Sequence, residues 1–371
     1  LDNELTTIEP LMAEVGAYDN SENFGRADRG AAYALHARLA LNSEVYTDGK
    51  VKDYQKAIDY CDKIINSGKY DLCRAEKNGY SGYQQLFMGD NDCNPEAMKE
   101  IIFPIRQDGL KARAYAGTTY LVSASTIAGM PYASTGDPWK CMFARENLIE
   151  KFFPNKNDIP KATVDDVLKN PSKEQVIAKD SEKGIGTADV IAKAKDDRAL
   201  LYMGVGGCEE GKVRTINPGE AITGPLNGAS FVKWSNLHAD GSTQHDQNYS
   251  DTDFPVFRLA EIYLTRAEAK YRLGQDGLDD ILKVQERAHR ASKATSVNEQ
   301  TLIDEWCREF FMEGRRRSDL VRFGLYTGSK YLWSFKGGAE KGAGVPSYYN
   351  IYPIPDNEIK NNPNMTQNPK Y

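Results

Sequence analysis

Apolar residues recur every three or four positions on two consecutive stretches in the first part of the chain. Residues 25–46 are rich in alanine and leucine, and residues 53–65 place their apolar side chains on one face. This spacing is typical of helices that bury one side. Because Asp48 and Gly49 interrupt the pattern, the two stretches predict an antiparallel helical hairpin.

A second helical hairpin is predicted near the end of the chain, over residues 255–273 and 278–291. Each hairpin begins with a helix in which alanine follows tyrosine by four positions: Tyr33 and Ala37, Tyr263 and Ala267. Small alanines let adjacent helices nest, as in tetratricopeptide repeats. We therefore expect residues 25–68 and 255–324 to pack together, although they lie far apart in the sequence.

The stretch 301–324 combines an apolar helix face with charged residues three or four positions apart, which can pair along a helix surface. A glycine is expected to end this helix, and a shorter helix is predicted over residues 319–323. We expect Glu309, Glu313 and Arg322 to be partly buried and paired. No nucleophile stands beside a base in this stretch, so we interpret it as architecture.

The chain between the hairpins has a different composition. Residues 78–253 are rich in Gly, Asn, Asp, Ser and Tyr, which predicts loops with a few short strands and one helix near 143–153. The predicted fold is therefore mainly α. Tetratricopeptide-like helical hairpins in residues 1–100 and 255–371 form a scaffold, and residues 101–254 form a large irregular, loop-rich insertion that binds the ligand.

Three sequence patterns follow one another over the last third of the chain. They are Arg258-Leu259-Ala260-Glu261-Ile262-Tyr263-Leu264 with Ala267-Glu268-Ala269; Glu305-x-x-Arg308-Glu309 with Glu313-Gly314-Arg315 and Asp319-Leu320-x-Arg322-x-Gly324; and Pro353-Ile354-Pro355-x-x-Glu358-Ile359 with Asn362-Pro363 and Gln367-Asn368-Pro369. Together they resemble the C-terminal signature of the SusD/RagB family, surface lipoproteins of Bacteroidetes that bind nutrients over a TonB-dependent transporter. Lys370 departs from that signature, because the family usually ends in Gly-Tyr.

The resemblance implies a non-catalytic surface protein that captures an oligosaccharide and delivers it to a SusC-like TonB-dependent transporter. It also implies a place at the cell surface of the outer membrane, reached through a lipid anchor upstream of this chain. The chain opens at Leu1 without a methionine, so we expect a processed or shortened form that lacks this anchor and the first hairpins. Part of the family's ligand contacts comes from that upstream region.

Three alternatives stay open. A RagB-like member would bind a peptide in place of a glycan, and a helical-repeat scaffold would bind only proteins. An enzyme such as a glycoside hydrolase is the third alternative, since its paired carboxylates are set by three-dimensional spacing and cannot be recognised in a sequence.

Composition and charge narrow the chemistry. The net charge of −6 argues against a nucleic-acid partner. Neither the four histidines nor the six cysteines have zinc-ligand spacing, and no phosphate-binding loop is complete, so we expect no metal and no cofactor. The acidic loop 238–253 lacks the ligand order of a calcium-binding EF-hand and is interpreted as solvated. The arginine run 315–317 is interpreted as a solvated helix junction. We expect no disulfide, with Cys61 and Cys307 as buried thiols.

Aromatic residues suggest the ligand contacts, because tyrosine and tryptophan offer a flat apolar face with a polar edge that suits a sugar ring. The chain has 21 tyrosines. The candidate binding residues are Tyr115, Tyr120, Tyr132, Trp139, Tyr202 and Trp234. Tyr132 and Trp139 are favoured, because the Ser-Thr-Gly-Asp-Pro sequence between them predicts an exposed turn. Ordinary core packing is the alternative for each candidate.

Overall fold

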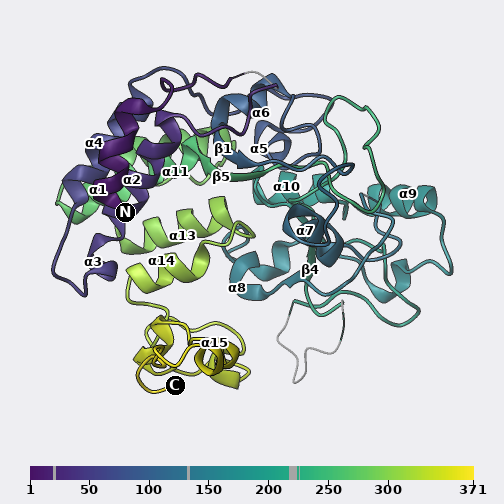
Figure 1. The fold of residues 1–371 in the computed structure, drawn as a ribbon. Coiled ribbons are helices and arrows are strands. Elements are labelled where there is room, and N and C mark those ends of the chain that lie inside the picture. The colour runs from purple at the N-terminus through teal and green to yellow at the C-terminus, as the bar shows by residue number, and fades with distance from the viewer. Residues whose placement is uncertain (20–21, 132–133, 217–223, 225) are drawn as a thin grey trace.

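Helices dominate both ends of the chain, and short elements joined by loops fill the middle (Figure 1). The computed structural model describes residues 1–19, 22–131, 134–216, 224 and 226–371. The end regions contain α1 (Asp2–Ile8), η1 (Glu9–Leu11), α2 (Arg29–Leu41), α3 (Ser43–Tyr46), α4 (Tyr54–Ile65), α11 (Leu259–Arg272), α12 (Leu278–Arg287), α13 (Glu299–Phe310), α14 (Arg316–Arg322), η4 (Lys336–Gly338), η5 (Ser347–Asn350) and α15 (Asp356–Asn361). The middle contains α5 (Gly82–Gln85), α6 (Pro95–Glu100), β1 (Ile101–Ile105), α7 (Gly117–Ser125), β2 (Phe143–Ala144), α8 (Glu146–Ile149), η2 (Lys156–Asp158), η3 (Val164–Asp166), α9 (Lys173–Lys183), α10 (Thr187–Ala194), β3 (Leu201–Tyr202), β4 (Ala229–Phe231) and β5 (Phe254–Arg258).

One apolar core joins helices from the two ends of the chain. Side chains of α2, α4, α11, α12 and α13 pack together in it, and Figure 1 shows α2, α4 and α11 as neighbours. Its small members include Ala34, Ala37, Ala57, Ala260 and Ala267. These side chains occupy little space, so the helices can approach closely. The expected packing of residues 25–68 against 255–324 is confirmed.

Strands β1 and β5 connect the irregular middle to the helical ends. They pair antiparallel, with Ile101 opposite Arg258 and Phe103 opposite Phe257. The helix predicted over 255–273 therefore begins only at Leu259, and the residues before it are strand. The sequence Phe-Pro-Val-Phe-Arg explains this difference, since aromatic and β-branched residues favour an extended backbone.

A second core fills the middle of the chain. In it, the Phe87 and Trp234 ring centroids lie 4.9 Å apart, and Trp234 stacks on Phe254 at 5.3 Å. The three-stranded sheet β2-β4-β3 supplies Ala144, Leu201 and Ala229 to the same core. The mainly α fold with a loop-rich middle is confirmed, while the division after residues 100 and 254 stays a prediction.

Three elements differ from the expectation. The helix expected over 143–153 is limited to the four residues of α8, preceded by strand β2. The helix of 301–324 ends at Phe310, and α14 begins at Arg316, earlier than expected. Gly314 lies in the turn between them with φ +74°, a conformation that glycine adopts without strain. The residues before 25, for which no helix is predicted, contain α1.

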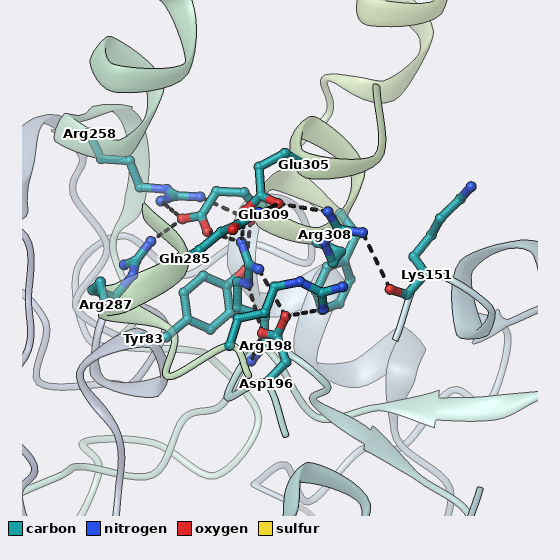
Figure 2. A network of polar contacts seen from close by, with 12 residues as sticks. Tyr83, Lys151, Asp196, Arg198, Arg258, Gln285, Arg287, Glu305, Arg308 and Glu309 are labelled. Atoms are coloured by element: carbon teal, nitrogen blue, oxygen red, sulfur yellow. Dashed lines mark hydrogen bonds and ion pairs between the residues drawn. The ribbon is translucent and has the colours of Figure 1, made fainter. Parts of the chain in front are cut away.

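A buried set of ion pairs surrounds α13 (Figure 2). We call it the ionic lattice; its members are Glu100, Asp196, Arg198, Lys233, Arg258, Arg287, Arg290, Glu305, Arg308, Glu309 and Glu313. Glu309 is at its centre. Arg258 Nη1 lies 2.6 Å from one of the Glu309 carboxylate oxygens, and Arg287 also donates to that oxygen. Arg198 Nη1 lies 3.0 Å from the other oxygen.

The lattice connects distant parts of the chain. Arg198 donates to both oxygens of Asp196, at 2.8 and 2.9 Å, and to Glu305 at 2.6 Å. Arg258, at the end of β5, donates to both oxygens of Glu313 at 2.8 and 2.9 Å. Glu100, at the end of α6, accepts from Arg258 at 3.1 Å. Removing charges from water is costly, so the lattice is stable only while every member has its partners.

Arg322 forms a second buried cluster next to the lattice. It donates to Glu268 at 2.8 and 2.9 Å and to Asp319 at 2.9 Å, and the indole N–H of Trp306 donates to Glu268 at 2.9 Å. Glu309, Glu313 and Arg322 are all buried and paired, which confirms the expectation for this stretch.

The arginine run 315–317 is not a solvated junction, and that expectation is wrong. Arg315 pairs with Glu261 at 2.5 Å and lies 4.9 Å from the centroid of a Trp306 ring. Arg316 donates to the carbonyl oxygen of Ile303 at 2.7 Å. These guanidinium groups pack inside the fold, because a guanidinium can donate hydrogen bonds and stack on an aromatic ring at the same time.

Glu309→Ala is expected to lower the free energy of unfolding by about 3–5 kcal/mol, because three buried guanidinium groups each lose one of their carboxylate partners. Glu209→Ala is the matched control: Glu209 pairs with Lys212 at the surface, with both side chains about 70% exposed, and such a pair contributes at most about 1 kcal/mol. Urea denaturation measures both. Equal midpoints for the two variants would contradict a stabilising lattice.

Stability should also fall in acid. Burial raises the pKa of Glu305, but Arg198 and Arg308 outweigh burial and lower it to about 2, against an ordinary value of 4.5. For Glu261, Arg315 and Arg38 likewise outweigh burial and lower the pKa to about 2. The stabilisation from these carboxylates is complete above the unfolded-state pKa and is lost as pH falls from about 4.5 toward about 2. Urea midpoints measured across this range should decline steeply; a flat profile would contradict the prediction.

Candidate functional site

Four aromatic side chains from separate segments meet at the surface of the middle region. We call Tyr115, Tyr120, Trp139 and Tyr249 the aromatic cluster. Trp139 lies between Tyr115 and Tyr120, with ring centroids 5.8 Å from each, and Tyr115 lies 5.1 Å from Tyr249. Tyr115 is 54% exposed and Tyr120 is 42% exposed, while the other two are half-buried. The cluster therefore presents ring surface to solvent.

Hydrogen bonds to helix α7 and within its own loop hold Trp139 in position. Its backbone N–H donates to the carbonyl oxygen of Ser123 in α7 at 2.9 Å. Its indole N–H donates to Asp137 at 2.9 Å, which fixes the ring orientation. The neighbouring Gly136 donates to the carbonyl of Gln247 at 2.8 Å, so the Trp139 loop is connected to the loop of Tyr249.

Helix α7 supports the other rings. It carries Tyr120, and Tyr115 lies two residues before its start. The N–H of Ser250 donates to the Thr119 hydroxyl at 3.0 Å, and the Thr118 hydroxyl donates to the carbonyl of Thr252 at 2.6 Å. These bonds attach the Tyr249 loop along the helix. The cluster is therefore built on a rigid element and two loops connected to it.

Charged groups lie beside the rings. The guanidinium of Arg113 is 5.5 Å from the Tyr249 ring centroid, and its Nη2 is 3.2 Å from Asp246. The backbone N–H of Asn248 is the main cause of the lowered pKa of Asp246, which Arg113 also favours. A hydrogen bond with Tyr249 raises the pKa of Tyr115, so this phenol stays protonated. The aromatic cluster is thus bordered by ionised and hydrogen-bonding groups.

The structure brings only some of the predicted residues together. Tyr115, Tyr120 and Trp139 belong to the cluster, whereas Tyr202 is 0% exposed and Trp234 is 4% exposed. The Tyr202 hydroxyl donates to Asp180 at 2.6 Å, and the Trp234 indole donates to a backbone carbonyl at 3.2 Å. These two residues are therefore packing residues, which corrects their placement at a surface site. Tyr132 lies outside the described residues.

Tyr249 is a member that the sequence reasoning missed. It lies in the polar run His-Asp-Gln-Asn-Tyr-Ser-Asp, residues 245–251. A lone aromatic residue in a polar, turn-rich run has no apolar neighbours to form a core. This is the same signal that favoured Trp139, and it identifies Tyr249 as well.

The acidic loop 238–253 is organised around a buried carboxylate. Asp251 accepts from the backbone N–H of His245 at 2.9 Å and lies 3.0 Å from His238 Nε2. This hydrogen bond to Asp251 raises the pKa of His238. Within the described parts of the chain, no group of three His, Cys, Asp or Glu side chains is arranged to hold a metal ion. All six cysteines are free thiols, and Cys61 and Cys307 are buried as expected.

Comparison with known proteins identifies relatives. The SusD family model matches residues 99–371. The starch-binding protein SusD of Bacteroides thetaiotaomicron is 50% identical over 376 residues, covering 100% of this chain and 64% of that protein. The chain therefore spans less than two thirds of this relative. Across the residues that the structure describes, no helix has both the length and the apolar character needed to cross a membrane.

Solved structures share the fold. A SusD-like protein from Bacteroides fragilis has a TM-score of 0.64 at 18% identity, covering 100% of this chain and 70% of that one. The surface glycan-binding protein A of B. thetaiotaomicron has a TM-score of 0.62 at 19% identity, covering 99% and 69%. The same protein was solved in complex with laminarihexaose, with a TM-score of 0.61, again at 19% identity and covering 99% and 69%.

The placement of the aromatic residues predicts a large loss of stability from one truncation and almost none from another. Trp234→Ala should lower the free energy of unfolding by about 3–5 kcal/mol, because it opens a cavity in the second core. Tyr115→Ala should change it by no more than about 0.5 kcal/mol, because the ring is largely exposed. Thermal or urea melts of the two variants test this. A large loss from Tyr115→Ala would mean that this ring is part of the core.

Proposed function

This chain belongs to the SusD family, and we propose that it is a non-catalytic binding protein that captures a glycan on the aromatic cluster. The cluster is the observation that carries the proposal. Exposed apolar ring surface is costly in water and is retained where it serves binding. Tyrosine and tryptophan stack on the apolar faces of sugar rings, while their polar edges and the neighbouring charges bond hydroxyl groups.

Stacking supplies most of the net affinity in this proposal. Each hydrogen bond to a sugar hydroxyl replaces one to water, so the net gain per bond is small at an open surface. Covering the rings releases water from apolar surface without a comparable loss. The loops that hold Trp139 are already bonded to α7, so little ordering is required when the ligand binds.

An α-linked glucan such as starch is the proposed ligand. The relative named as starch-binding is 50% identical to this chain, whereas the neighbour solved with laminarihexaose is 19% identical. The ring geometry supports the same ligand. Neighbouring rings in the cluster are tilted by 41–60°, so they form a curved surface rather than one plane. A curved surface suits a glucan whose linkage bends the chain.

The carboxylates near the cluster are poor candidates for hydrolysis. Glycosidases need one carboxylic acid with a raised pKa to protonate the leaving oxygen. Asp246 instead has a lowered pKa, because it accepts a backbone hydrogen bond and faces Arg113. Asp137 is occupied by the indole N–H of Trp139. Both observations support capture without turnover.

The remaining part of the proposal concerns the cell. By its family resemblance, the full-length protein would be lipid-anchored at the outer-membrane surface and would pass its glycan to a SusC-like TonB-dependent transporter. Co-purification of the full-length protein with a SusC-like transporter from the same organism tests this step. The RagB-like peptide ligand and the protein-only scaffold remain alternatives, and each is an outcome of the titration below.

Titration calorimetry with maltohexaose and laminarihexaose tests the capture of a glycan. We expect binding of maltohexaose, and Trp139→Ala or Tyr115→Ala should weaken it about tenfold or more through lost stacking. Tyr349→Ala is the matched control, because Tyr349 is also an exposed tyrosine, at 41%, but lies in the C-terminal segment outside the cluster. This variant should bind as the parent does.

The outcomes separate the alternatives. Equal loss from Trp139→Ala and Tyr349→Ala would contradict a site at the cluster. Binding of laminarihexaose but not maltohexaose would keep the site and overturn the α-glucan. Binding of an unrelated oligopeptide but of neither glycan would favour the RagB-like alternative, and binding of none of these three ligands would favour the protein-only scaffold. Glucose release on long incubation would indicate an enzyme.

A further inference from the structure

A cavity of about 440 Å³ opens between α8, the α13–α14 pair and residues 326–334. We propose that this cavity binds a small organic carboxylate with an apolar or aromatic body. The site is separate from the aromatic cluster, shares no residue with it and does not depend on the proposed function. Its volume falls in the range of about 300–1,000 Å³ typical of small-molecule sites.

The walls of the cavity are mainly apolar and aromatic. Leu148, Phe310, Phe311, Leu320 and Trp333 are among the residues that line it. An apolar body gains free energy from covering such walls in proportion to the surface it removes from water. A fully polar ligand such as a sugar would leave its hydroxyls without partners along most of this surface, so the lining argues against a second glycan site.

Arg145, one of three arginines on the cavity wall, has no hydrogen-bond partner for its terminal nitrogens among the described residues. Both of these nitrogens are buried. Burial lowers the pKa of this guanidinium. A buried donor without an acceptor is destabilising, and more so when it is charged. A carboxylate in the cavity would remove this cost, because its two oxygens match the fork of the guanidinium.

Two phenyl rings leave only the edge of Arg145 for a ligand. Its guanidinium carbon lies 5.8 Å from the centroid of Phe143 and 5.4 Å from that of Phe335. Phe335 has φ +68° and ψ +9°, a left-handed conformation that is unusual for a bulky residue. Such strain is kept where the surrounding structure requires one particular placement. Here it places a ring against the guanidinium.

The other two arginines on the wall already donate to protein oxygens. Arg317 donates through Nη2 to the carbonyls of Tyr349 and Asn350, at 2.7 and 3.2 Å. Arg316 donates to the carbonyl of Ile303 at 2.7 Å and to the Tyr331 hydroxyl at 2.6 Å. Asn147 accepts from the backbone N–H of Ser334 at 2.9 Å. Arg145 is therefore the group that selects the charge of the ligand, and the apolar lining selects its body.

Calorimetry with 2-naphthoate and its neutral analogue 2-naphthamide tests the site. The pair shares one aromatic body and differs in its head group, a charged carboxylate in one and a neutral carboxamide in the other. We expect the protein to bind naphthoate about tenfold or more tightly than naphthamide, with quenching of tryptophan fluorescence because Trp333 lines the cavity. Arg145→Met should bring the two affinities within about twofold, since methionine fills similar space without charge.

Three further variants make the test specific. Arg145→Lys keeps the charge but loses the fork, so the preference for naphthoate should shrink without vanishing. Leu148→Trp should fill the cavity and abolish binding of both compounds while Arg145 is intact. Trp139→Ala, in the aromatic cluster, should leave naphthoate binding unchanged. Maltohexaose binding by each Arg145 and Leu148 variant, together with its melting curve, checks that the fold is intact.

The proposal is overturned if the parent binds both compounds equally or binds neither. It is also overturned if the preference for naphthoate survives Arg145→Met, because another cation would then be responsible. If Arg145→Met does not fold, Arg145→Lys and Leu148→Trp still decide. If the parent does not bind maltohexaose, the proposed function is contradicted, and the conclusion from naphthoate binding is unaffected.

Discussion

The buried carboxylate of Glu309 is the constraint on which the rest of the structure depends. It accepts from three guanidinium groups, carried by the loop after α10, by the end of β5 and by α12. Only α12 is next to α13 in the order of elements; the loop after α10 and β5 lie farther back in the sequence. Because an incomplete ion-pair set in a low-dielectric interior is strongly destabilising, the segments can settle in only one mutual arrangement. The apolar cores then pack around a geometry that the charges specify.

The aromatic cluster depends on this arrangement indirectly. Its rings are carried by loops of the middle region, whose own strands are short. The lattice fixes that region against the helical ends through Glu100 and Arg258. Hydrogen bonds between the loops and α7 then hold the rings in position. An irregular region can therefore present a preformed surface, provided that its base is tied at a few strong points.

Much of the helical scaffold could be predicted from the sequence, because apolar spacing directly reflects burial in α2, α4, α12 and α13. The site was predictable only in part. Trp139 and Tyr202 are equally aromatic, and the local sequence does not show that the first ring is at the surface while the second is enclosed by Asp180, Ile127 and Met130. Arg198 was likewise unrecognisable, because its partners on α13, Glu305 and Glu309, are more than a hundred positions away along the chain.

The lattice and the aromatic cluster have different consequences for evolution. A substitution at a lattice position removes the partner of other buried charges. It is therefore tolerated only together with compensating substitutions at the partner positions. The rings of the cluster have solvent on one side, and each can be exchanged with little effect on its neighbours. On the proposed function, ligand specificity can therefore change one residue at a time, while the ionic lattice that supports those residues stays unchanged.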